Sequence, residues 1–431
     1  MSLLSDLRWR GLIHHTTSDD KIEAWLEEKP RTVYAGFDPS ADSLHVGSLL
    51  GLVVLRRFQK AGHKPIAVVG GATGMIGDPS GKSDERNLLS KKDLEENVAG
   101  MGEQMRRFLE FDAGSASAEL VNNFDWTASW SYLEFLRDIG KNFPVNVMLA
   151  KDSVKSRLGR QVEEGQSGGM SYTEFSYMLL QAYDFVHLYD TVGCELQAGG
   201  SDQWGNITAG IDLARRMRGV QLFGLTWPLL TKTDGTKMGK TESGAIWLSA
   251  QRTSPYHFYQ YWINLDDSEV GGCLRMLTEL SREEIEVLDL AREQDPGQRE
   301  SQRSLAKELT HLVHGESGLA IAQQATDIFF GAEIANLDDT QLCQIFADVP
   351  SQEINRSRLS DNRLTIVEAL VESGLSKSKG EARRTVEQGG GYVNNRRVEG
   401  IETQLTAAHL ASETTMVLRS GKKKYALLRF V

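Results

Sequence analysis

The sequence predicts an α/β fold built on a parallel sheet, followed by an α-helical region and a small α+β region. Up to about residue 249, short apolar segments alternate with longer segments of helical periodicity, the pattern of repeated strand–helix units. Beyond that point the strand pattern stops, and it returns only near the C-terminus. We therefore expect three domains, residues 1–249, 250–346 and 363–431, with residues 347–362 as a polar linker.

The composition is that of a globular protein long enough for two to three domains. Of its 431 residues, 40% are hydrophobic and 25% are charged. The three cysteines, Cys194, Cys273 and Cys343, lie far apart, which argues against a disulfide framework or a zinc site and fits a reducing cytoplasm. No segment approaches membrane-spanning length, and the N-terminus lacks the apolar core of a signal peptide. We expect a cytoplasmic protein without a membrane partner.

The net charge of −11 is unevenly distributed along the chain. Residues 361–431 hold 12 Lys and Arg against 8 Asp and Glu, a net charge of +4, whereas the remaining residues hold 36 against 51, a net charge of −15. A basic tail on an acidic body is the asymmetry expected if the tail contacts RNA. A merely solvated basic surface is the alternative.

Each element of the first part follows from a local pattern. Short runs of β-forming residues predict strands at 33–37, 64–70, 119–123, 194–199 and 225–230. Helical periodicity predicts helices at 44–60, 90–111, 130–139, 172–186 and 206–218. Ser43 is a candidate N-cap for the helix at 44–60, and Ser281 with Glu284 forms a candidate capping box further on.

The chain from Tyr34 to Ser48 joins the first predicted strand to the first turn of a helix. Free backbone N–H groups and the positive end of the helix dipole favour a bound phosphate there. Gly47 leaves room for a flat group to lie on the backbone. The alternative is a loop that merely joins two elements, but it leaves the polar cluster before an apolar helix unexplained.

Two further loops carry glycine and basic residues. Gly70 to Ser83 follows the second strand and includes Lys82, with Arg86 close behind, so that these cations could hold phosphate. A P-loop would need glycine where Ile76 stands, so that fingerprint is missed by one residue. The second loop contains Lys237, Met238, Gly239 and Lys240. A flexible glycine loop and a basic surface loop are the respective alternatives.

Two polar runs complete the candidate site. Tyr177, Gln181 and Asp184 are spaced i, i+4, i+7 and share one helix face, either as a binding pocket or as a solvated face. The run from Glu195 to Asn206 ends a strand in two glycines, which allow close backbone approach to a ligand, before Asp202 and Gln203.

These motifs together resemble class I aminoacyl-tRNA synthetases, and the run from Tyr34 to Gly47 resembles the bacterial tyrosyl-tRNA synthetase family. His45-Val-Gly47-Ser48 is similar to the His-Ile-Gly-His signature, with Ser48 replacing the second histidine. Lys237 to Thr241 resembles Lys-Met-Ser-Lys-Ser, with Gly239 and Thr241 replacing the serines. The resemblance implies a Rossmann-like catalytic domain, a helical anticodon-binding domain and a C-terminal RNA-binding domain.

The resemblance also implies roles for individual residues. Expected tyrosine-binding residues are Tyr34, Asp78, Tyr177, Gln181, Asp184 and Gln203. Expected ATP-binding residues are Asp38, Gly47, Ser48, Gly200, Asp202 and Met238. Expected catalytic residues are Ser40, His45, Lys82, Arg86, Lys237, Lys240 and Thr241. Expected RNA-binding residues are Lys377, Lys379, Arg383 and Arg384. Among the tyrosine-binding residues, Tyr34 and Asp184 would hold the phenolic hydroxyl, and Asp78, Tyr177 and Gln181 the ammonium.

The implied reaction activates L-tyrosine with ATP, giving tyrosyl-adenylate and pyrophosphate, and then passes the tyrosyl group to the 3′-terminal adenosine of a tRNA. Mg²⁺ is expected to accompany ATP, without a tightly bound cofactor or a structural metal. The resemblance also implies a homodimer. Two other functions remain open at this point: a ligase of the same fold for tryptophan, and an RNA-binding protein that has kept the scaffold without its catalysis.

Overall fold

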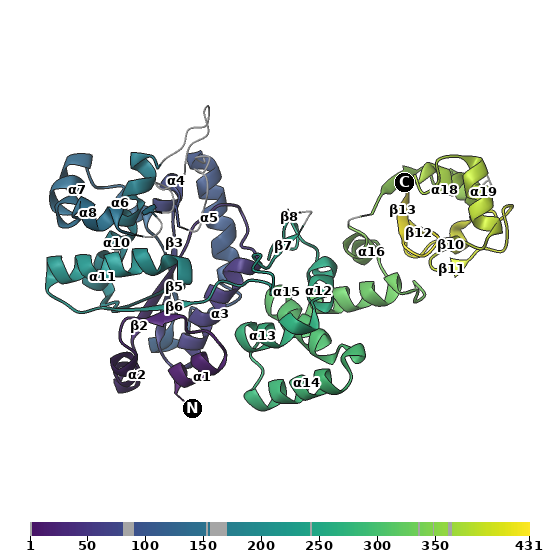
Figure 1. The fold of residues 1–431 in the computed structure, drawn as a ribbon. Helices are drawn as coiled ribbons and strands as arrows, with labels where there is room; N and C mark the ends of the chain where they lie inside the picture. The colour runs from purple at the N-terminus through teal and green to yellow at the C-terminus, as the bar shows by residue number, and fades with distance from the viewer. Residues whose placement is uncertain are drawn as a thin grey trace. The chain divides into compact units, whose positions relative to one another are not determined.

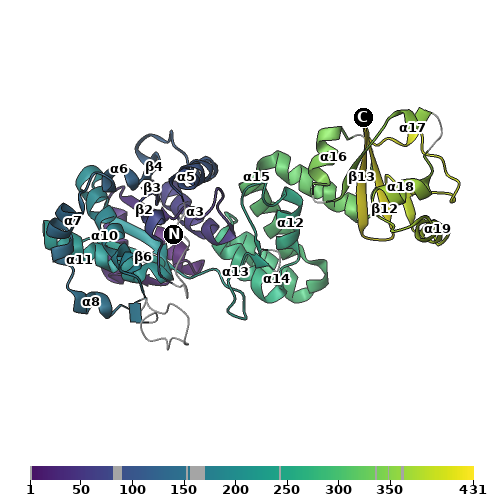
Figure 2. The same ribbon diagram turned by 90° about the horizontal axis from the view of Figure 1, so that it is seen from above.

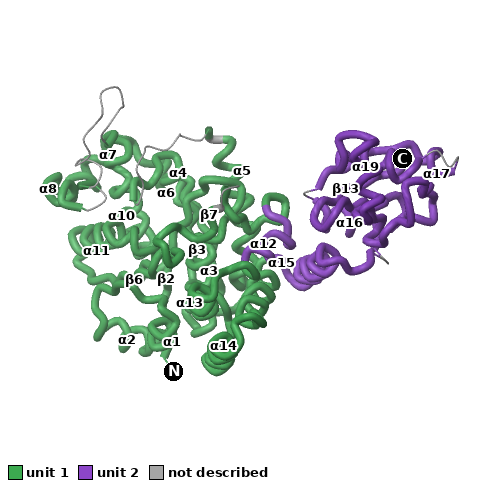
Figure 3. Tube along the Cα trace, turned by 45° about the vertical axis from the view of Figure 1, so that its right-hand side comes forward, with its two compact units in different colours: residues 1–252, 262–313 green, residues 253–261, 314–431 purple. Residues whose placement is uncertain are grey.

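The computed structural model describes residues 2–80, 90–151, 154–155, 170–241, 244–334, 337–347, 349–360 and 364–431. These residues form two compact units (Figure 3). The first unit consists of residues 1–252 with 262–313, and the second of residues 253–261 with 314–431. In the described parts of both units, no helix is long and apolar enough to cross a lipid bilayer.

A six-stranded sheet forms the centre of the first unit. Its strands are β1 (His15–Thr16), β2 (Thr32–Phe37), β3 (Lys64–Val69), β4 (Glu119–Asn122), β5 (Leu196–Gly200) and β6 (Phe223–Trp227). They lie in the order β1-β6-β5-β2-β3-β4, and all neighbours are parallel except the edge strand β1. The strand order therefore reverses between β2 and β5, where a parallel sheet opens a crevice at the carboxyl ends of its strands.

Helices cover both faces of this sheet (Figures 1 and 2). The helices of this region are α1 (Leu3–Trp9), α2 (Asp19–Glu28), α3 (Val46–Lys60), α4 (Thr73–Ile76), α5 (Lys91–Met105), α6 (Phe124–Thr127), α7 (Tyr132–Asp138), α8 (Val145–Leu149), α10 (Tyr172–Val192) and α11 (Trp204–Arg218). Both views place α3 and α5 on one side of the sheet and α10 and α11 on the other. The predicted α/β class with a parallel sheet is confirmed.

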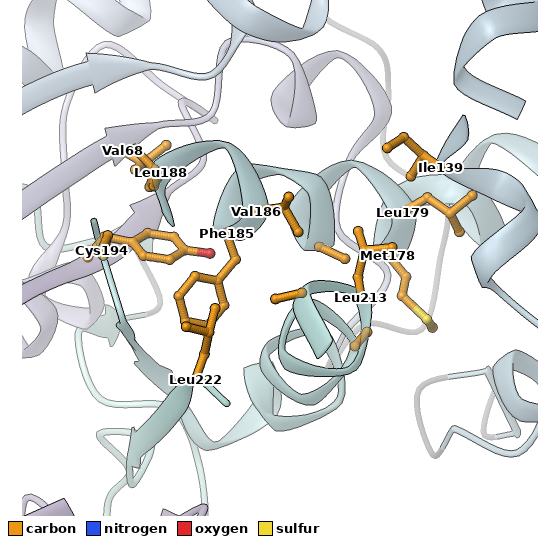
Figure 4. Close-up of a cluster of buried hydrophobic side chains, with 14 of the residues drawn as sticks. Val68, Ile139, Met178, Leu179, Phe185, Val186, Leu188, Cys194, Leu213 and Leu222 are labelled. Carbon is orange, nitrogen blue, oxygen red and sulfur yellow. The ribbon is translucent and has the colours of Figure 1, made fainter. Parts of the chain in front are cut away.

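The long helix α10 links the hydrophobic core to the crevice. Ser171 caps its start by accepting a hydrogen bond from the backbone N–H of Glu174, and Gly193 ends it in the left-handed conformation. Phe185 and Leu188 point into a buried cluster with Leu213 of α11 and Val68 of β3 (Figure 4). Because its apolar residues are anchored in this core, α10 presents its polar residues to the crevice at fixed positions.

The start of α3 differs from the expected one. The predicted helix began at Leu44 with Ser43 as its cap, but the helix begins at Val46 and His45 is the N-cap. His45 is extended because it forms a β-bridge with Trp247, and the N–H of Val46 donates to the carbonyl of Ile246. A contact from 200 residues away thus sets this boundary, which local pattern alone could not indicate. At α10, by contrast, the helix continues six residues past the predicted end at 186.

Helices dominate the chain after a small hairpin, β7 (Lys240–Thr241) with β8 (Gly244–Ala245). They are α12 (Pro255–Ile263), α13 (Asp267–Leu277), α14 (Arg282–Gln294), α15 (Glu300–Phe329) and α16 (Asp339–Ile345). The predicted capping box at Ser281 and Glu284 is present. Gly315 interrupts α15 with φ 71°, at the boundary between the two units.

The end of the chain forms a second sheet within the second unit. Its strands are β9 (Ser351–Ile354), β10 (Gly391–Val393), β11 (Arg396–Arg397), β12 (Thr415–Ser420) and β13 (Lys424–Phe430), in the order β11-β10-β12-β13-β9. The helices α17 (Ser357–Ser360), α18 (Ile366–Glu372) and α19 (Lys379–Glu387) accompany it. Strand β9 belongs to the segment expected to be a linker, and it pairs in parallel with β13.

Candidate active site

A cavity of about 430 Å³ lies in the first unit, at the carboxyl ends of the sheet strands. Residues that directly follow β2, β3, β4 and β5 all contribute to its wall. The predicted site residues in this wall are Tyr34, Asp38, Ser40, His45, Gly47, Ser48, Asp78, Tyr177, Gln181, Asp184, Gly200, Asp202, Gln203, Lys237, Met238 and Lys240. Lys82, Arg86 and the side chain of Thr241 lie outside the described part of the chain.

Tyr34 of β2 and Asp184 of α10 form a deeply buried pair in this wall. Their exposed fractions are 1% and 3%. The hydroxyl of Tyr34 has no hydrogen-bond partner among the described residues. Burial raises the pKa of Tyr34 well above its usual value, and the charge of the neighbouring Asp184 raises it further. A ligand that can both donate and accept a hydrogen bond would suit this site, because it could donate to the carboxylate of Asp184 and accept from the neutral phenol of Tyr34.

Two side chains that the sequence analysis missed hold Asp184 in place. Asn123 donates to Oδ2 at 3.0 Å, and the indole N–H of Trp126 donates to Oδ1 at 2.8 Å. Burial raises the pKa of Asp184 to about 7, although these two hydrogen bonds favour the charged form. Asn123 directly follows β4, and a polar residue at the carboxyl end of a strand was a usable signal. Nothing in the sequence singled out Trp126.

An amide and carboxylate network lines another part of the wall. The amide of Gln203 donates to Oδ2 of Asp78 at 2.6 Å, while its oxygen accepts hydrogen bonds from Gln181 at 3.2 Å and Asn206 at 3.1 Å. The amide oxygen of Gln181 is buried and has no partner among the described residues. This surface offers acceptor oxygens to a ligand, which suits a positively charged group.

Asp38 follows β2 directly and contacts Tyr177 and Thr73. The hydroxyl of Tyr177 lies 3.3 Å from Oδ2 of Asp38, and Thr73 donates to Oδ1 at 3.1 Å. A Cβ atom on Gly70 would lie only 2.5 Å from Oδ1 of Asp38. A side chain at position 70 would therefore displace the carboxylate of Asp38 or the hydroxyl of Thr73.

The cavity is also lined by the N-terminal end of α3 and by two lysines, Lys237 and Lys240. Burial lowers the pKa of His45, and the charges of Lys240 and Lys237 lower it further, so its imidazole is neutral at pH 7. A Cβ atom on Gly47 would lie 2.8 Å from Cε1 of His45. Gly47 thus lets the imidazole lie against the first turn of the helix.

The loop at residues 232–240, which we call the lysine loop, is attached to α13 at two points. The backbone N–H of Thr233 donates to Oε1 of Glu269 at 3.3 Å, and Sγ of Cys273 lies 3.5 Å from Sδ of Met238. Gly239 has φ 82°, and a Cβ atom there would lie 2.8 Å from Cβ of Val46. Lys237 and Lys240 line the cavity, and between them a side chain at position 239 would meet Val46 of α3.

Gly200 and Asp202 lie where β5 ends. A Cβ atom on Gly200 would approach Oδ1 of Asp202 to 2.8 Å, so a side chain at this position would crowd that carboxylate. Burial raises the pKa of Asp202, and the charge of Asp78 raises it further. Carboxylates at this position can accept hydrogen bonds from hydroxyl groups.

The predicted RNA-binding residues belong to the second unit and are not among the residues that line this cavity. Lys377, Lys379, Arg383 and Arg384 are all exposed at the start of α19. Lys379 pairs with Glu368 at 2.9 Å. The helix begins at Lys379 with Ser378 as its cap.

Metal-binding groups are not apparent near these residues. Across the described ranges, there is no cluster of three or more His, Cys, Asp or Glu side chains that could hold a metal ion.

Comparison with protein families gives two matches that follow one another along the chain. Residues 26–331 match the family of class I tRNA synthetases for tryptophan and tyrosine. Residues 341–428 match the C-terminal domain of tyrosine–tRNA ligases.

Individual proteins match over nearly the whole length. The tyrosine–tRNA ligase of Rhodopirellula baltica is 59% identical over 428 residues, covering 99% of this chain and 96% of the relative. That of Geobacillus stearothermophilus is 50% identical over 431 residues and covers all of both chains. Among solved structures, a C-terminally truncated mitochondrial tyrosyl-tRNA synthetase from Aspergillus nidulans has a TM-score of 0.67 and 32% identity, covering 76% of this chain and 94% of that one.

A tryptophanyl-tRNA synthetase from Giardia lamblia shares the fold, with a TM-score of 0.52 and 15% identity over 79% of this chain and 88% of that one. At that identity the likeness concerns the fold alone, whereas the full-length relatives are tyrosine–tRNA ligases. The chain therefore belongs to the tyrosine–tRNA ligase family of class I aminoacyl-tRNA synthetases.

Proposed function

We propose that the cavity of the first unit binds L-tyrosine and ATP side by side and forms tyrosyl-adenylate, which then reacts with the terminal adenosine of a tRNA. The observation that carries this proposal is the hydroxyl of Tyr34, which is buried beside Asp184 and has no hydrogen-bond partner in the described part of the chain. The same cavity is also lined by His45, Lys237 and Lys240, which suit a triphosphate.

In the proposed complex the phenol of the substrate lies between Tyr34 and Asp184. Asp78, Tyr177 and Gln181 face its ammonium, and Gln203 lies toward its carboxylate. Phenylalanine would give the buried hydroxyl of Tyr34 no partner and would give Asp184 no donor beyond Asn123 and Trp126, which is costly, so the pair selects for tyrosine. Tryptophan has no hydroxyl for this pair either, which favours tyrosine over the related ligase activity.

The first step needs no protein nucleophile or general base, because the carboxylate of tyrosine is already ionised. It attacks the α-phosphorus of ATP in line, and pyrophosphate leaves. Catalysis then consists of positioning and charge stabilisation. His45 and Ser40 would contact the phosphates, and Lys82, Arg86, Lys237, Lys240 and Thr241 would support the leaving pyrophosphate. Asp38, Gly47, Ser48, Gly200, Asp202 and Met238 would hold the nucleoside and its ribose.

Mg²⁺ enters this reaction bound to the phosphates of ATP, since this ion keeps several waters and binds best to substrate oxygens. For tRNA we propose two kinds of surface: the helical region for the anticodon, and the exposed cations Lys377, Lys379, Arg383 and Arg384 for phosphates. We place the protein in the cytoplasm, where its cysteines would remain reduced.

We further propose a homodimer that forms through the face bearing α7, α8 and the start of α10. Large hydrophobic side chains are exposed there: Tyr132 at 65%, Leu133 at 76%, Val145 at 59% and Tyr172 at 61%. Tyr132 and Tyr172 also share a hydrogen bond. An apolar patch of this kind is typical of a protein–protein contact.

The test is amino-acid-dependent exchange of pyrophosphate into ATP, measured without tRNA. Tyrosine should support exchange, and tryptophan and phenylalanine should support far less at equal concentration. Exchange with tryptophan and none with tyrosine would overturn the proposal.

A further inference from the structure

A cluster of aromatic side chains lies behind Asp184, outside the cavity. It consists of Trp126, Trp130, Phe135, Tyr183 and His187. The rings of Trp126 and His187 are stacked, with centroids 4.5 Å apart and planes inclined by 16°. Tyr183 contacts Trp130 at 5.5 Å and His187 at 6.2 Å between centroids. Only Trp126 of this group donates a hydrogen bond to Asp184.

The two donors that hold Asp184 are fixed in different ways. Asn123 donates to Thr73 at 3.0 Å, and its amide oxygen accepts from the N–H of Ala72 at 2.7 Å. Its orientation is therefore set by hydrogen bonds. Trp126 has one N–H and uses it on Asp184. Its helix, α6, is only four residues long, so the direction of the indole depends on what packs against its face.

His187 supplies that packing. It lies three residues after Asp184 on α10, so both side chains emerge on the same face of the helix. Burial lowers the pKa of His187, while the charge of Asp190 opposes this shift. Asp190 is itself paired with Arg218 at 2.6 Å. A neutral ring that covers part of the indole suits a packing role.

We propose that His187 is a positioning residue for amino-acid selection: by stacking on Trp126 it keeps the indole N–H directed at Asp184 and so fixes the carboxylate that receives the substrate hydroxyl. This inference rests on the proposed tyrosine site. It implies that a side chain with no contact to the substrate contributes to the discrimination between tyrosine and phenylalanine. Any flat ring at position 187 should serve, because the contribution is packing and not charge.

The experiment compares His187→Ala with His187→Phe in pyrophosphate exchange, using tyrosine and phenylalanine as substrates. His187→Ala should lower the discrimination about three- to tenfold, the range that corresponds to the net contribution of one ordinary hydrogen bond. The loss should appear as a higher KM for tyrosine, with kcat and the KM for ATP nearly unchanged. His187→Phe should restore most of the discrimination because it keeps the stacked ring.

A second comparison uses Trp126→Phe, which keeps a ring but removes the N–H. In that background His187→Ala should cause no further loss, since the hydrogen bond it supports is already absent. Unchanged discrimination in His187→Ala, no rescue by His187→Phe, or an equal loss in the Trp126→Phe background would each overturn the inference. Failure of the unsubstituted protein to use tyrosine would instead overturn the proposed function.

Discussion

At the scale of single residues, the candidate site depends on polar groups that are buried before any ligand arrives. Asp184 shows this most clearly, because burial raises its pKa to about 7 while its two hydrogen-bond donors oppose the rise. Between about pH 4 and pH 7 the folded protein therefore holds a proton on this carboxyl that the unfolded chain has released. A ligand that completes the hydrogen bonding of Asp184 and Tyr34 would relieve part of this cost.

This difference predicts a pH dependence of stability. The contribution of Asp184 to the free energy of unfolding should fall as the pH rises from about 4 to about 7, by at most on the order of 4 kcal/mol. Urea unfolding of the ligand-free protein across this range should show the fall, and Asp184→Asn should reduce it. Asp20→Asn, at an exposed position on α2, is the control and should leave the profile as it is. An identical profile for Asp184→Asn would show that the carboxyl keeps an ordinary pKa.

Some residues of the candidate site could be predicted from the sequence, and others could not. Tyr177, Gln181 and Asp184 were predictable because helical spacing places them on one face, and His45 and Gly47 because they follow a strand. Trp126 was not, since its role depends on the fold bringing α6 and α10 together, and a single tryptophan carries no pattern. Cys273 was unpredictable for the same reason: its contact with Met238 joins segments 35 residues apart.

At the scale of elements, the lysine loop and the start of α3 depend on each other. The carbonyl of Gly239 accepts from the N–H of Ile246, and the carbonyl of Ile246 accepts from the N–H of Val46. The loop therefore reaches the first turn of α3 through a continuous set of backbone hydrogen bonds. This explains why α3 begins at Val46, later than its apolar periodicity indicated.

Gly239→Ala tests this coupling, with Gly235→Ala as a matched control. Both glycines have φ 82°, so alanine carries a similar backbone cost of about 1 kcal/mol at each position. Only at Gly239 would the new Cβ also meet Val46, at 2.8 Å. We expect Gly239→Ala to slow adenylate formation at least tenfold more than Gly235→Ala in single-turnover measurements, with tyrosine affinity little changed in both. Equal rates in the two variants would argue against the contact with α3.

At the scale of the whole molecule, the proposed function assigns tyrosine activation to the first unit and phosphate contacts with tRNA to exposed cations of the second. The sequence predicted a parallel sheet and a basic tail, because alternating strands and helices and the uneven charge are properties of long segments. It did not indicate that β9, in the expected linker, completes the C-terminal sheet. That strand is short and mostly exposed, so its pairing with β13 depends on the tertiary fold and leaves little local pattern.

We therefore expect substitutions on α19 to affect the aminoacylation of tRNA without affecting the activation of tyrosine. Reversing two charges on α19, Arg383→Glu with Arg384→Glu, should raise the KM for tRNA about tenfold or more in aminoacylation and reduce its salt dependence. Pyrophosphate exchange should stay unchanged, since that step does not involve tRNA. Lys21→Glu, at an exposed position on α2, serves as the charge control and should affect neither reaction. A matching loss of pyrophosphate exchange in the α19 variant would contradict this separation.

In the proposed function, one cavity holds a phenol-binding slot and a phosphate-binding end as distinct regions. The decisive measurement is pre-steady-state adenylate formation in His45→Ala and Tyr34→Phe, with tyrosine affinity measured in parallel. We expect His45→Ala to slow adenylate formation by about 10²-fold while tyrosine affinity stays nearly constant. We expect Tyr34→Phe to weaken tyrosine binding and the preference for tyrosine over phenylalanine. In Tyr34→Phe the rate of adenylate formation from bound tyrosine should change much less. A large loss of tyrosine affinity in His45→Ala, or unchanged discrimination in Tyr34→Phe, would contradict the proposal.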